Sequence, residues 1–242
     1  MPFDFDALVD AATRPYAGAG KYAYEFTRGK LRHDPVFRAL LKRGLLPGDG
    51  LLLDLGCGLG VLPALLHEAR NHYRAGEWPS DWASPPQNLE FHGIELSARK
   101  AEIGRQALQG KATIRQGDIR TAELPDCSVA VILDVLLYLS ADEQKLTLQR
   151  VARAIRPGGM LLMREGDAAG GWRFHATRLS EQMCCLWRGQ GWYPLHYRTV
   201  SEWTALLQEL GFSVEVLPMS EGTPFSNVMF RAMLVTPNES QP

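Results

Sequence analysis

The chain has 242 residues, 45% of them hydrophobic and 22% charged, with a formal net charge of −1. This length and composition suit one globular domain with a large core, and the near-zero charge excludes a global field that would attract nucleic acid or an anionic membrane. The acidic start MPFDFDALVDAA does not resemble a secretory signal, and the longest apolar run, VAVILDVLLYL, is too short to span a bilayer. A cytoplasmic protein is therefore expected.

Residues 1–46 are predicted to be helical. Asp34 followed by Pro35 is typical of a helix start, because aspartate caps backbone N–H groups and proline fits the first turn. This helix is expected to end at Gly44.

From residue 48 to about 160, short apolar runs alternate with helical stretches, which predicts a parallel sheet covered by helices on both faces. Strands are predicted at 50–56, 88–96, 111–119, 128–136 and 160–165. Helices are predicted at 60–71, 97–110 and 140–159. Ser140 and Glu143 form a capping box for the last of these helices, and the Pro-Gly-Gly sequence at 157–159 should terminate it.

The C-terminal part has a different pattern. Residues 166–198 are predicted to form an irregular, tryptophan-rich insertion on the acceptor side. A helix at 201–210, capped by Thr199 and Glu202, precedes strands at 212–219 and 226–235. The short connection between these strands favours an antiparallel hairpin, so the sheet should be parallel except at one edge. The last six residues are expected to fray.

Residues 71–88 form a loop insertion between a helix and a strand. Such connections usually take about 2–6 residues, so this one is expected to be either functional or disordered. Trp78 and Trp82 indicate packing, and a surface excursion that closes on its own tryptophans is an equal alternative.

The stretch LLLDLGCGLG, residues 51–60, predicts a strand followed by a glycine turn that approaches a ligand closely. The dinucleotide pattern G-x-G-x-x-G would need a third glycine where Val61 stands, and no G-K-[ST] sequence follows. The pattern is instead D-x-G-x-G-x-G, which does not favour a grip on pyrophosphate.

Acidic residues at the ends of the following strands favour a nucleoside ligand. Glu95 lies 39 positions after Gly56, or 21 when the 18-residue insertion is subtracted, close to the ~20 expected for an acid that binds ribose hydroxyls. A solvated strand-end acid is the alternative. Asp118 can accept a hydrogen bond from an adenine amino group, with Ile119 packed on the ring. Asp134 ends an apolar strand and should point into the same crevice.

The ordered motifs LLLDLGCGLG, GIELS, QGDIR, VILDVLLYLS and RPGGMLLMRE, over about residues 48–165, resemble the class I S-adenosylmethionine-dependent methyltransferases. The resemblance implies a single domain over 1–242 with an α/β, doubly wound, seven-stranded Rossmann-like sheet that is mostly parallel with one antiparallel edge strand. It also implies S-adenosyl-L-methionine as cofactor and S-adenosyl-L-homocysteine as product. The cofactor-binding residues that follow from it are Asp54, Gly56, Cys57, Gly58, Gly60, Glu95, Leu96, Asp118, Ile119 and Asp134, with Cys57 expected to pack within the loop.

Several acceptor classes do not fit the residues after the fourth strand. The [D/N/S]-P-P-[Y/F/W] motif of amino-methylating enzymes and the nucleophilic cysteine of cytosine C5 enzymes are absent there. Leu137 and Tyr138 stand where small-molecule relatives often carry a histidine, so Tyr138 is expected to line the acceptor pocket. No metal site is predicted.

The N-terminal segment 13–43 carries a local net charge of about +6 on a nearly neutral protein. One interpretation is a solvated helix face. The other is that residues 1–46 form a lid, in which Tyr22 or Lys30 reaches the cofactor carboxylate and other basic residues bind an acidic partner. That partner would be a carboxylated small molecule, an acyl carrier protein or, less readily, RNA.

The region after the fifth strand is the expected acceptor side, and its aromatic residues favour an aromatic or apolar small-molecule acceptor. The candidate catalytic residues are His175, Tyr138 and Asp167. The candidate substrate-binding residues are Tyr138, Arg164 and Trp172. His175 could equally be a surface residue, and Arg164 could equally form an ion pair with Glu165 or Asp167.

The segments RGKLRHDPVF and TPFSNVMF faintly resemble methyltransferases of bacterial aryl-polyene pigment pathways. This implies a hydroxylated aromatic acceptor that can be bound to a carrier protein. The alternatives are an RNA or protein methyltransferase, or a non-enzymatic NAD-binding module on the same sheet. No nucleic-acid or membrane partner is expected, and the oligomeric state stays open.

Overall fold

The structure is a computed structural model that describes residues 3–187, 189 and 191–235. The tail predicted to fray, 237–242, lies outside these residues. Their contacts divide into two compact units. The N-terminal unit contains residues 1–123 and 127–129, and the C-terminal unit contains residues 124–126 and 130–242.

Seven strands form one sheet in the order β3-β2-β1-β4-β5-β7-β6. Their bounds are β1 Asp49–Leu55, β2 Asn88–Glu95, β3 Thr113–Gln116, β4 Cys127–Leu133, β5 Ile155–Gly166, β6 Phe212–Pro218 and β7 Asn227–Leu234. Strands β1, β2 and β3 are parallel, whereas β7 runs antiparallel to both β5 and β6. The predicted fold class is confirmed, with one refinement: the reversed strand lies between β5 and β6, so β6 is the edge strand.

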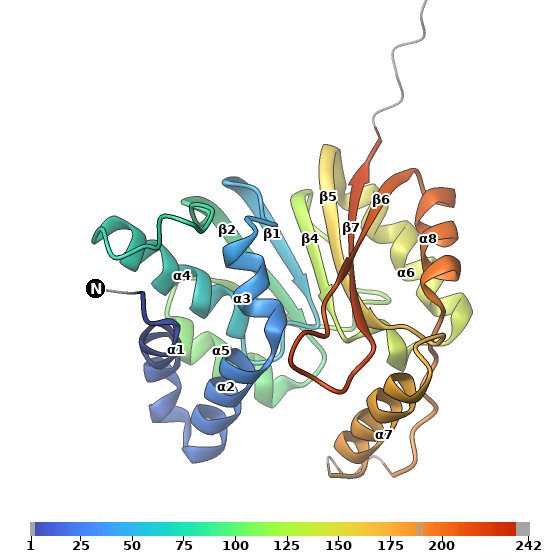
Figure 1. The fold of residues 1–242 in the computed structure, drawn as a ribbon, viewed down its shortest axis with the longest axis horizontal. Helices are drawn as coiled ribbons and strands as arrows, with labels where there is room; N and C mark the ends of the chain where they lie inside the picture. The colour runs from blue at the N-terminus through green and yellow to red at the C-terminus, as the bar shows by residue number, and fades with distance from the viewer. Residues whose placement is uncertain (1–2, 188, 190, 236–242) are drawn as a thin grey trace, which may run out of the picture. The chain divides into compact units, whose positions relative to one another are not determined.

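The helices of the N-terminal unit are α1 Phe5–Thr13, the 3-10 helix Arg14–Ala19, α2 Lys21–His33, α3 Pro35–Lys42, α4 Val61–Arg74 and α5 Ala98–Leu108 (Figure 1). The predicted start of α3 is confirmed, because the Val36 N–H donates to the Asp34 carboxylate (3.1 Å) and Pro35 takes the first position. Leucines from both faces of β1 are buried, as expected for a strand covered on both sides.

The loop between α4 and β2 is shorter than predicted, because α4 continues to Arg74. Trp82 is nearly buried, and its ring meets the edges of Trp78 (5.7 Å) and Phe3 (5.1 Å). The Arg38 guanidinium lies 5.6 Å from the centre of the same ring. The loop therefore packs on its own tryptophans and on residues near α1 and in α3.

The C-terminal unit contains the 3-10 turn Leu136–Tyr138 and the helices α6 Ala141–Ala154, α7 Trp172–Trp187 and α8 Val200–Glu209. Both predicted capping boxes, Ser140 with Glu143 and Thr199 with Glu202, are present. No helix in the described ranges is both long and apolar enough to cross a membrane.

Two predictions for this unit were wrong. Helix α6 ends at Ala154, and the Pro-Gly-Gly sequence lies within β5. Pro157 disfavours a helical conformation at Arg156, the residue before it, so the helix has to end earlier, and its C-cap Ile155 is already extended. The second error concerns 166–198, which is not irregular throughout, because α7 occupies 172–187. Glycines 170 and 171 precede a run without glycine or proline, which lets a helix form there.

Candidate functional site

The glycine loop joins β1 to α4. Gly56, Gly58 and Gly60 all have positive φ values, of 79°, 60° and 74°, which glycine adopts without steric cost. A Cβ on Gly60 would lie 2.6 Å from Leu108 Cδ1, so that glycine is also required by packing. Around a Cβ on Gly58 there is open space. The backbone at Gly58 can therefore be approached closely by a ligand.

Cys57 lies on the packed side of this loop. Its Sγ atom would be 2.6 Å from a Cβ built on Gly93, so the thiol fills the space that this glycine leaves on β2. Burial, followed by the negative charges of Asp54 and Glu95, raises the pKa of Cys57 well above its ordinary value. The thiol is therefore protonated and inert, in line with the expected packing role.

Glu95 ties the glycine loop to the end of β2. Its Oε2 accepts a hydrogen bond from the Gly58 N–H (2.9 Å), and its Oε1 accepts one from the Ser97 N–H (2.9 Å). The carboxylate is nearly buried. Each carboxylate oxygen keeps a second lone pair, so Glu95 can hold the loop and still accept hydrogen bonds from ribose hydroxyls.

Asp54, at the end of β1, is a buried acid. Burial, and then the neighbouring charge of Glu95, raises the pKa of Asp54 from 3.8 to about 7. Its carboxyl is therefore close to half-protonated at neutral pH. A bound cation would favour the ionised form, and the amino group of a methionine moiety is such a cation.

Tyr16 is a residue of this site that the sequence did not reveal. Its buried hydroxyl lies 3.0 Å from both the Leu59 and Gly60 carbonyl oxygens, to which it can donate. This contact fixes the end of the glycine loop against the 3-10 helix Arg14–Ala19. No local pattern marks such a contact, because Tyr16 precedes Leu59 by 43 residues.

The residues predicted to bind the nucleoside, Leu96, Asp118 and Ile119, differ in their burial and in their hydrogen bonds. Asp118 and Ile119 follow β3, and Ile119 is buried. The Asp118 carboxylate is bound by the Arg120 side chain, with Nη2 2.6 Å from Oδ2, and it also accepts the Arg120 backbone N–H (2.9 Å). Leu96, directly after Glu95, is 65% exposed. An exposed leucine beside a buried carboxylate suits the surface of a nucleoside.

The two residues predicted in the lid also have partners within the N-terminal helices. Lys30 forms an ion pair with Asp34 (2.8 Å), and the Tyr22 ring stacks on Phe26 at 5.8 Å. The local positive charge is also reduced from outside the segment, because Arg28 and Arg32 pair with Asp10 and Asp6 of α1 at 2.8 Å and 2.9 Å. The apparent +6 charge is therefore partly neutralised within the unit.

In the C-terminal unit, Arg164 and Asp134 form an ion pair. Arg164 Nε lies 2.9 Å from Asp134 Oδ1, and a second hydrogen bond joins Nη2 to Oδ2. The ion pair that the structure shows is therefore with Asp134, a partner that the sequence did not indicate. Glu165 is the next residue of β5 and points to the opposite face of the sheet, whereas the Asp134 backbone N–H already donates to the Arg164 carbonyl (3.1 Å).

Glu165 is fully buried below the turn that follows β4. Its Oε1 accepts the Leu136 N–H at 2.9 Å. Burial, and then the charge of Asp134, raises the pKa of Glu165 well above its ordinary value. Glu165 thus stabilises the turn that carries Tyr138.

Tyr138 belongs to a cluster of aromatic and acidic side chains. Its hydroxyl donates to Glu181 Oε2 on α7 (3.0 Å), and its ring meets the edge of Tyr193 at 5.9 Å. Tyr197 meets the edge of Phe174 at 5.1 Å. Within the described part of the chain, the buried Tyr197 hydroxyl has no hydrogen-bond partner. A buried polar atom without a partner is costly, so it marks a place where a ligand could supply one.

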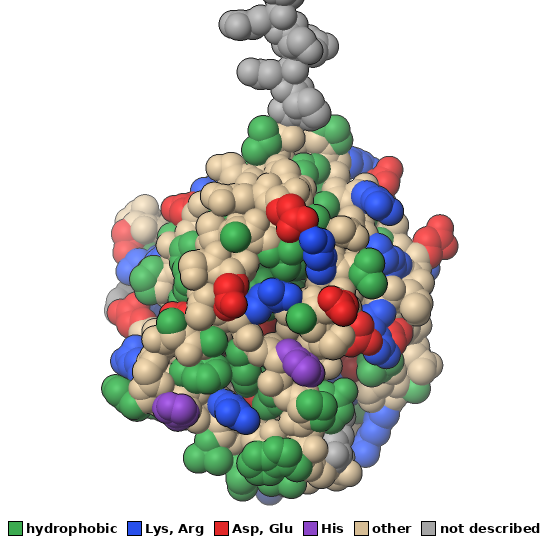
Figure 2. All heavy atoms as spheres, turned by 90° about the vertical axis from the view of Figure 1, so that its right-hand side faces the viewer, with side chains coloured by type: hydrophobic (Ala, Val, Ile, Leu, Met, Phe, Trp, Pro, Cys, Tyr) green, Lys and Arg blue, Asp and Glu red, His purple; other side chains and the backbone are tan. Residues whose placement is uncertain are grey.

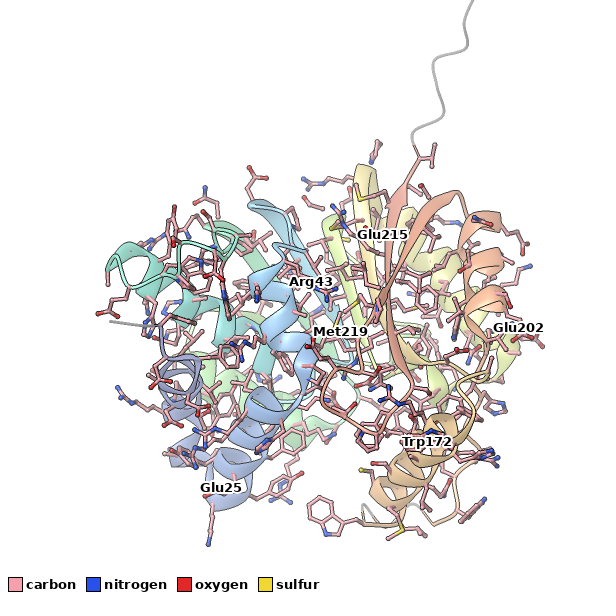
Figure 3. All side chains as sticks on the ribbon, in the orientation of Figure 1. Glu25, Arg43, Trp172, Glu202, Glu215 and Met219 are labelled. Atoms are coloured by element: carbon pink, nitrogen blue, oxygen red, sulfur yellow. The ribbon has the colours of Figure 1, made fainter. Side chains whose placement is uncertain are left out.

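Of the other predicted acceptor-side residues, His175 borders this cluster, because its ring lies 5.9 Å from that of Phe174. Asp167 Oδ1 accepts the Ala169 N–H (3.0 Å) and the Val200 N–H (3.2 Å), so it anchors the start of α8. His175 is exposed on α7. Trp172 is exposed and lies at the start of α7, where Figure 3 labels it. Among residues 3–187, 189 and 191–235, no three His, Cys, Asp or Glu side chains are placed to hold a metal ion.

Comparison with known protein families shows to which family the part of the chain with the glycine loop belongs. The family model described as "Methyltransferase domain" matches residues 52–159. Residues 52–159 belong to the methyltransferase domain family. The predicted methyltransferase family is thereby confirmed over this part of the chain.

Sequence relatives of this methyltransferase domain carry a more specific name. A carboxy-S-adenosyl-L-methionine synthase of Enterobacter sp. (strain 638) is 31% identical over 175 residues, which are 67% of this chain and 66% of that protein. The synthase of Chromohalobacter salexigens is 28% identical over 117 residues, 46% of this chain and 38% of that protein. The chain thus spans less than two thirds of the length of these relatives.

Solved structures share the fold. An O-methyltransferase family protein from Burkholderia thailandensis matches with a TM-score of 0.64 and 14% identity, over 98% of this chain and 65% of that one. Magnesium protoporphyrin IX methyltransferase from Synechocystis PCC 6803 matches with a TM-score of 0.58 and 18% identity, over 92% of each chain. At these identities the likeness supports the fold alone.

The matched range 52–159 includes the glycine loop, Glu95, Asp118, Asp134 and Tyr138. The residues present fit the cofactor of the family: the backbone at Gly58 is open to a ligand, Glu95 offers lone pairs for ribose, and Leu96 offers apolar surface. The predicted residues outside the matched range are Tyr22, Lys30, Arg164, Asp167, Trp172 and His175.

Proposed function

We propose that the protein transfers the methyl group of S-adenosylmethionine to a hydroxyl oxygen of a small aromatic molecule. The donor half of the proposal rests on the link between Glu95 and the Gly58 N–H (2.9 Å), because it joins the ribose-binding acid to the open loop. The bound cofactor supplies an electrophilic methyl carbon on a sulfonium. In this proposal Glu95 and Leu96 hold the ribose side, and Asp118 and Ile119 hold the adenine.

The acceptor half rests on the aromatic and acidic cluster of the C-terminal unit. Four rings, those of Tyr138, Tyr193, Tyr197 and Phe174, supply surface for an aromatic acceptor. The Tyr197 hydroxyl, which has no partner among the described residues, can bond to a polar group of that acceptor. Arg164 and Trp172 remain candidate substrate-binding residues.

Glu181 is the proposed proton acceptor. Its carboxylate takes the proton of the acceptor hydroxyl as the oxygen–carbon bond forms and the carbon–sulfur bond breaks, and Tyr138 positions it through the 3.0 Å hydrogen bond. His175 is the alternative base. Asp167 is a weaker candidate, because its Oδ1 already accepts two backbone N–H groups. The protein would then leave the acceptor as a methyl ether and the donor as S-adenosylhomocysteine.

The faint aryl-polyene resemblance supports a hydroxylated ring held on a carrier protein as one form of the acceptor. An RNA acceptor has less support, because Arg28 and Arg32 of the basic segment pair with acids of α1. A second candidate function comes from the relatives: the 31% identical protein is named for making carboxy-S-adenosyl-L-methionine. In that case S-adenosylmethionine would be the substrate that is modified.

Calorimetry with S-adenosylhomocysteine tests the donor site. The protein should bind this product and not NAD. Replacement of Glu95 by alanine should weaken binding at least about tenfold, because it removes a charged partner of two N–H groups. Glu90→Ala on the same strand is the matched control, since Glu90 is exposed. Tight NAD binding without S-adenosylhomocysteine binding, or equal affinities for the two variants, would contradict the assignment.

Turnover with a panel of hydroxylated aromatic acids tests the acceptor site. Glu181→Gln should lower kcat about a hundredfold and remove the acidic limb of its pH profile. Glu215→Gln, an exposed change on β6, should have no effect. If His175→Ala instead abolishes turnover and Glu181→Gln does not, His175 is the base. Conversion of S-adenosylmethionine to a product with one extra carboxyl group would support the second candidate function.

A further inference from the structure

Helix α7 presents a row of large apolar side chains to solvent. Trp172, Leu179, Met183, Leu186 and Trp187, here called the apolar ridge, are between 43% and 72% exposed. Their spacing of seven, four, three and one residues places them on one face of a helix with 3.6 residues per turn. The opposite face is turned inward, where Thr177 and Cys185 are buried. One exposed face of this helix is therefore largely apolar.

The ridge is flanked by positive charge. Arg173 and Arg178 are exposed, and at 100° per residue they fall on opposite sides of the ridge. Glu181 is the one acidic residue in α7. It lies half-buried and accepts a hydrogen bond from Tyr138, so its carboxylate does not lie on the exposed face that carries the ridge. Figure 2 shows hydrophobic side chains gathered at the lower end of the molecule, where Figure 1 draws α7.

We propose that the apolar ridge docks on an anionic membrane surface. Leucine, methionine and tryptophan side chains on one face, with arginines along its borders, are the composition of helices that lie in the headgroup region. Trp172 and Trp187 stand about 22 Å apart at the two ends of the helix, and tryptophan is enriched at membrane interfaces. The long arginine side chains can reach lipid phosphates while their stems stay along the apolar surface.

Charge distinguishes this occupant from a second copy of the chain. Two copies paired through the ridge would bring Arg173 and Arg178 of one copy against the same arginines of the other, and like charges across an interface are unfavourable. An anionic surface satisfies both sides of the ridge at once. The overall net charge of −1 does not report this, because the acidic residues that balance it lie elsewhere. The inference therefore departs from the expectation that the protein has no membrane partner.

Vesicle flotation tests the proposal on the intact protein without either substrate, so its result is independent of the methyl-transfer assignment. Vesicles of phosphatidylglycerol and phosphatidylcholine should carry the protein upward, and vesicles of phosphatidylcholine alone should not. Trp172→Ser with Leu179→Ser should weaken partitioning at least about tenfold. Arg173→Gln and Arg178→Gln should each weaken partitioning onto the vesicles about fivefold. Added salt should also weaken partitioning, because it screens the attraction between the arginines and the anionic lipids.

Matched controls come from α6 of the same unit. Leu146 is 59% exposed and Arg153 is exposed, so Leu146→Ser and Arg153→Gln test whether any surface leucine or arginine matters. Both should leave partitioning unchanged, and circular dichroism should show equal folding of all variants. Absence of binding to anionic vesicles, or equal losses in ridge and control variants, would overturn the proposal. Binding of the ridge to an acidic protein, with none to vesicles, would also overturn it.

Discussion

Replacement of Arg164 by methionine should lower the free energy of unfolding by about 3 kcal/mol, measured by urea unfolding at pH 7. Arg164 is only 1% exposed, and it forms two hydrogen bonds with the carboxylate of Asp134. Methionine fills much of the same space, but it removes the cation from a carboxylate that also lies near buried Glu165. The cost is therefore electrostatic, arising from a largely desolvated negative charge.

Two variants separate this effect from loss of packing. Arg231→Met breaks an ion pair with Glu215 on the surface, where both side chains are substantially exposed, and should cost less than about 1 kcal/mol. Adding Asp134→Asn to Arg164→Met should recover part of the stability, because the charge itself is then removed. A double variant no more stable than Arg164→Met alone would show that the methionine change acts through packing.

Replacement of Asp54 by asparagine should flatten the dependence of stability on pH. The folded protein raises the pKa of Asp54 from 3.8 to about 7, so the folded state holds a proton that the unfolded state has released between these values. The stabilisation from this carboxyl is complete below about pH 4 and is lost as the pH rises through about 7. The loss amounts to roughly 4 kcal/mol. Asparagine has a similar shape and does not titrate.

The measurement compares unfolding free energies of wild type and Asp54→Asn at pH 5 and pH 8, without cofactor. The variant should gain on the wild type as the pH rises. Glu165 also has a raised pKa, but it is present in both proteins and cancels in the comparison. Asp49→Asn, an exposed change at the start of β1, should leave the pH dependence as it is. Parallel pH profiles for wild type and Asp54→Asn would show that Asp54 is ionised when folded.

The elements that sequence predicted well are those set by local contacts. The caps at Asp34, Ser140 and Thr199 are bonds between residues two or three positions apart, so their pattern is visible in the chain. The parallel part of the sheet follows from the alternation of strands and helices. The end of α6 was misplaced because Pro157 acts on the residues before it, so the helix ends at Ala154 and β5 begins at Ile155.

Residues of the candidate site that went unrecognised depend on long-range contacts. Tyr16 meets the glycine loop across 43 residues, and Tyr138 meets Glu181 across 43 residues. The partner of Arg164 is 30 positions away, because neighbouring strands bring Asp134 to it. Glu95 could be found only because the family spacing survives once the insertion is subtracted. The sequence pattern thus located the cofactor loop, whereas the long-range contacts that fix the site residues in place became visible only in the structure.

The residues that contact the glycine loop are synthesised early, in the first half of the chain. The contacts that shape this loop come from Tyr16, Ile94, Glu95, Leu108 and Ile114, all within the first 114 residues. Chains emerge from the ribosome N-terminus first, and compact units generally fold as they appear. The cofactor loop can therefore take its shape while α7 is still being translated. By contrast, the bond between Tyr138 and Glu181 cannot form until the chain has passed residue 181, so acceptor-side order is a late step in biogenesis.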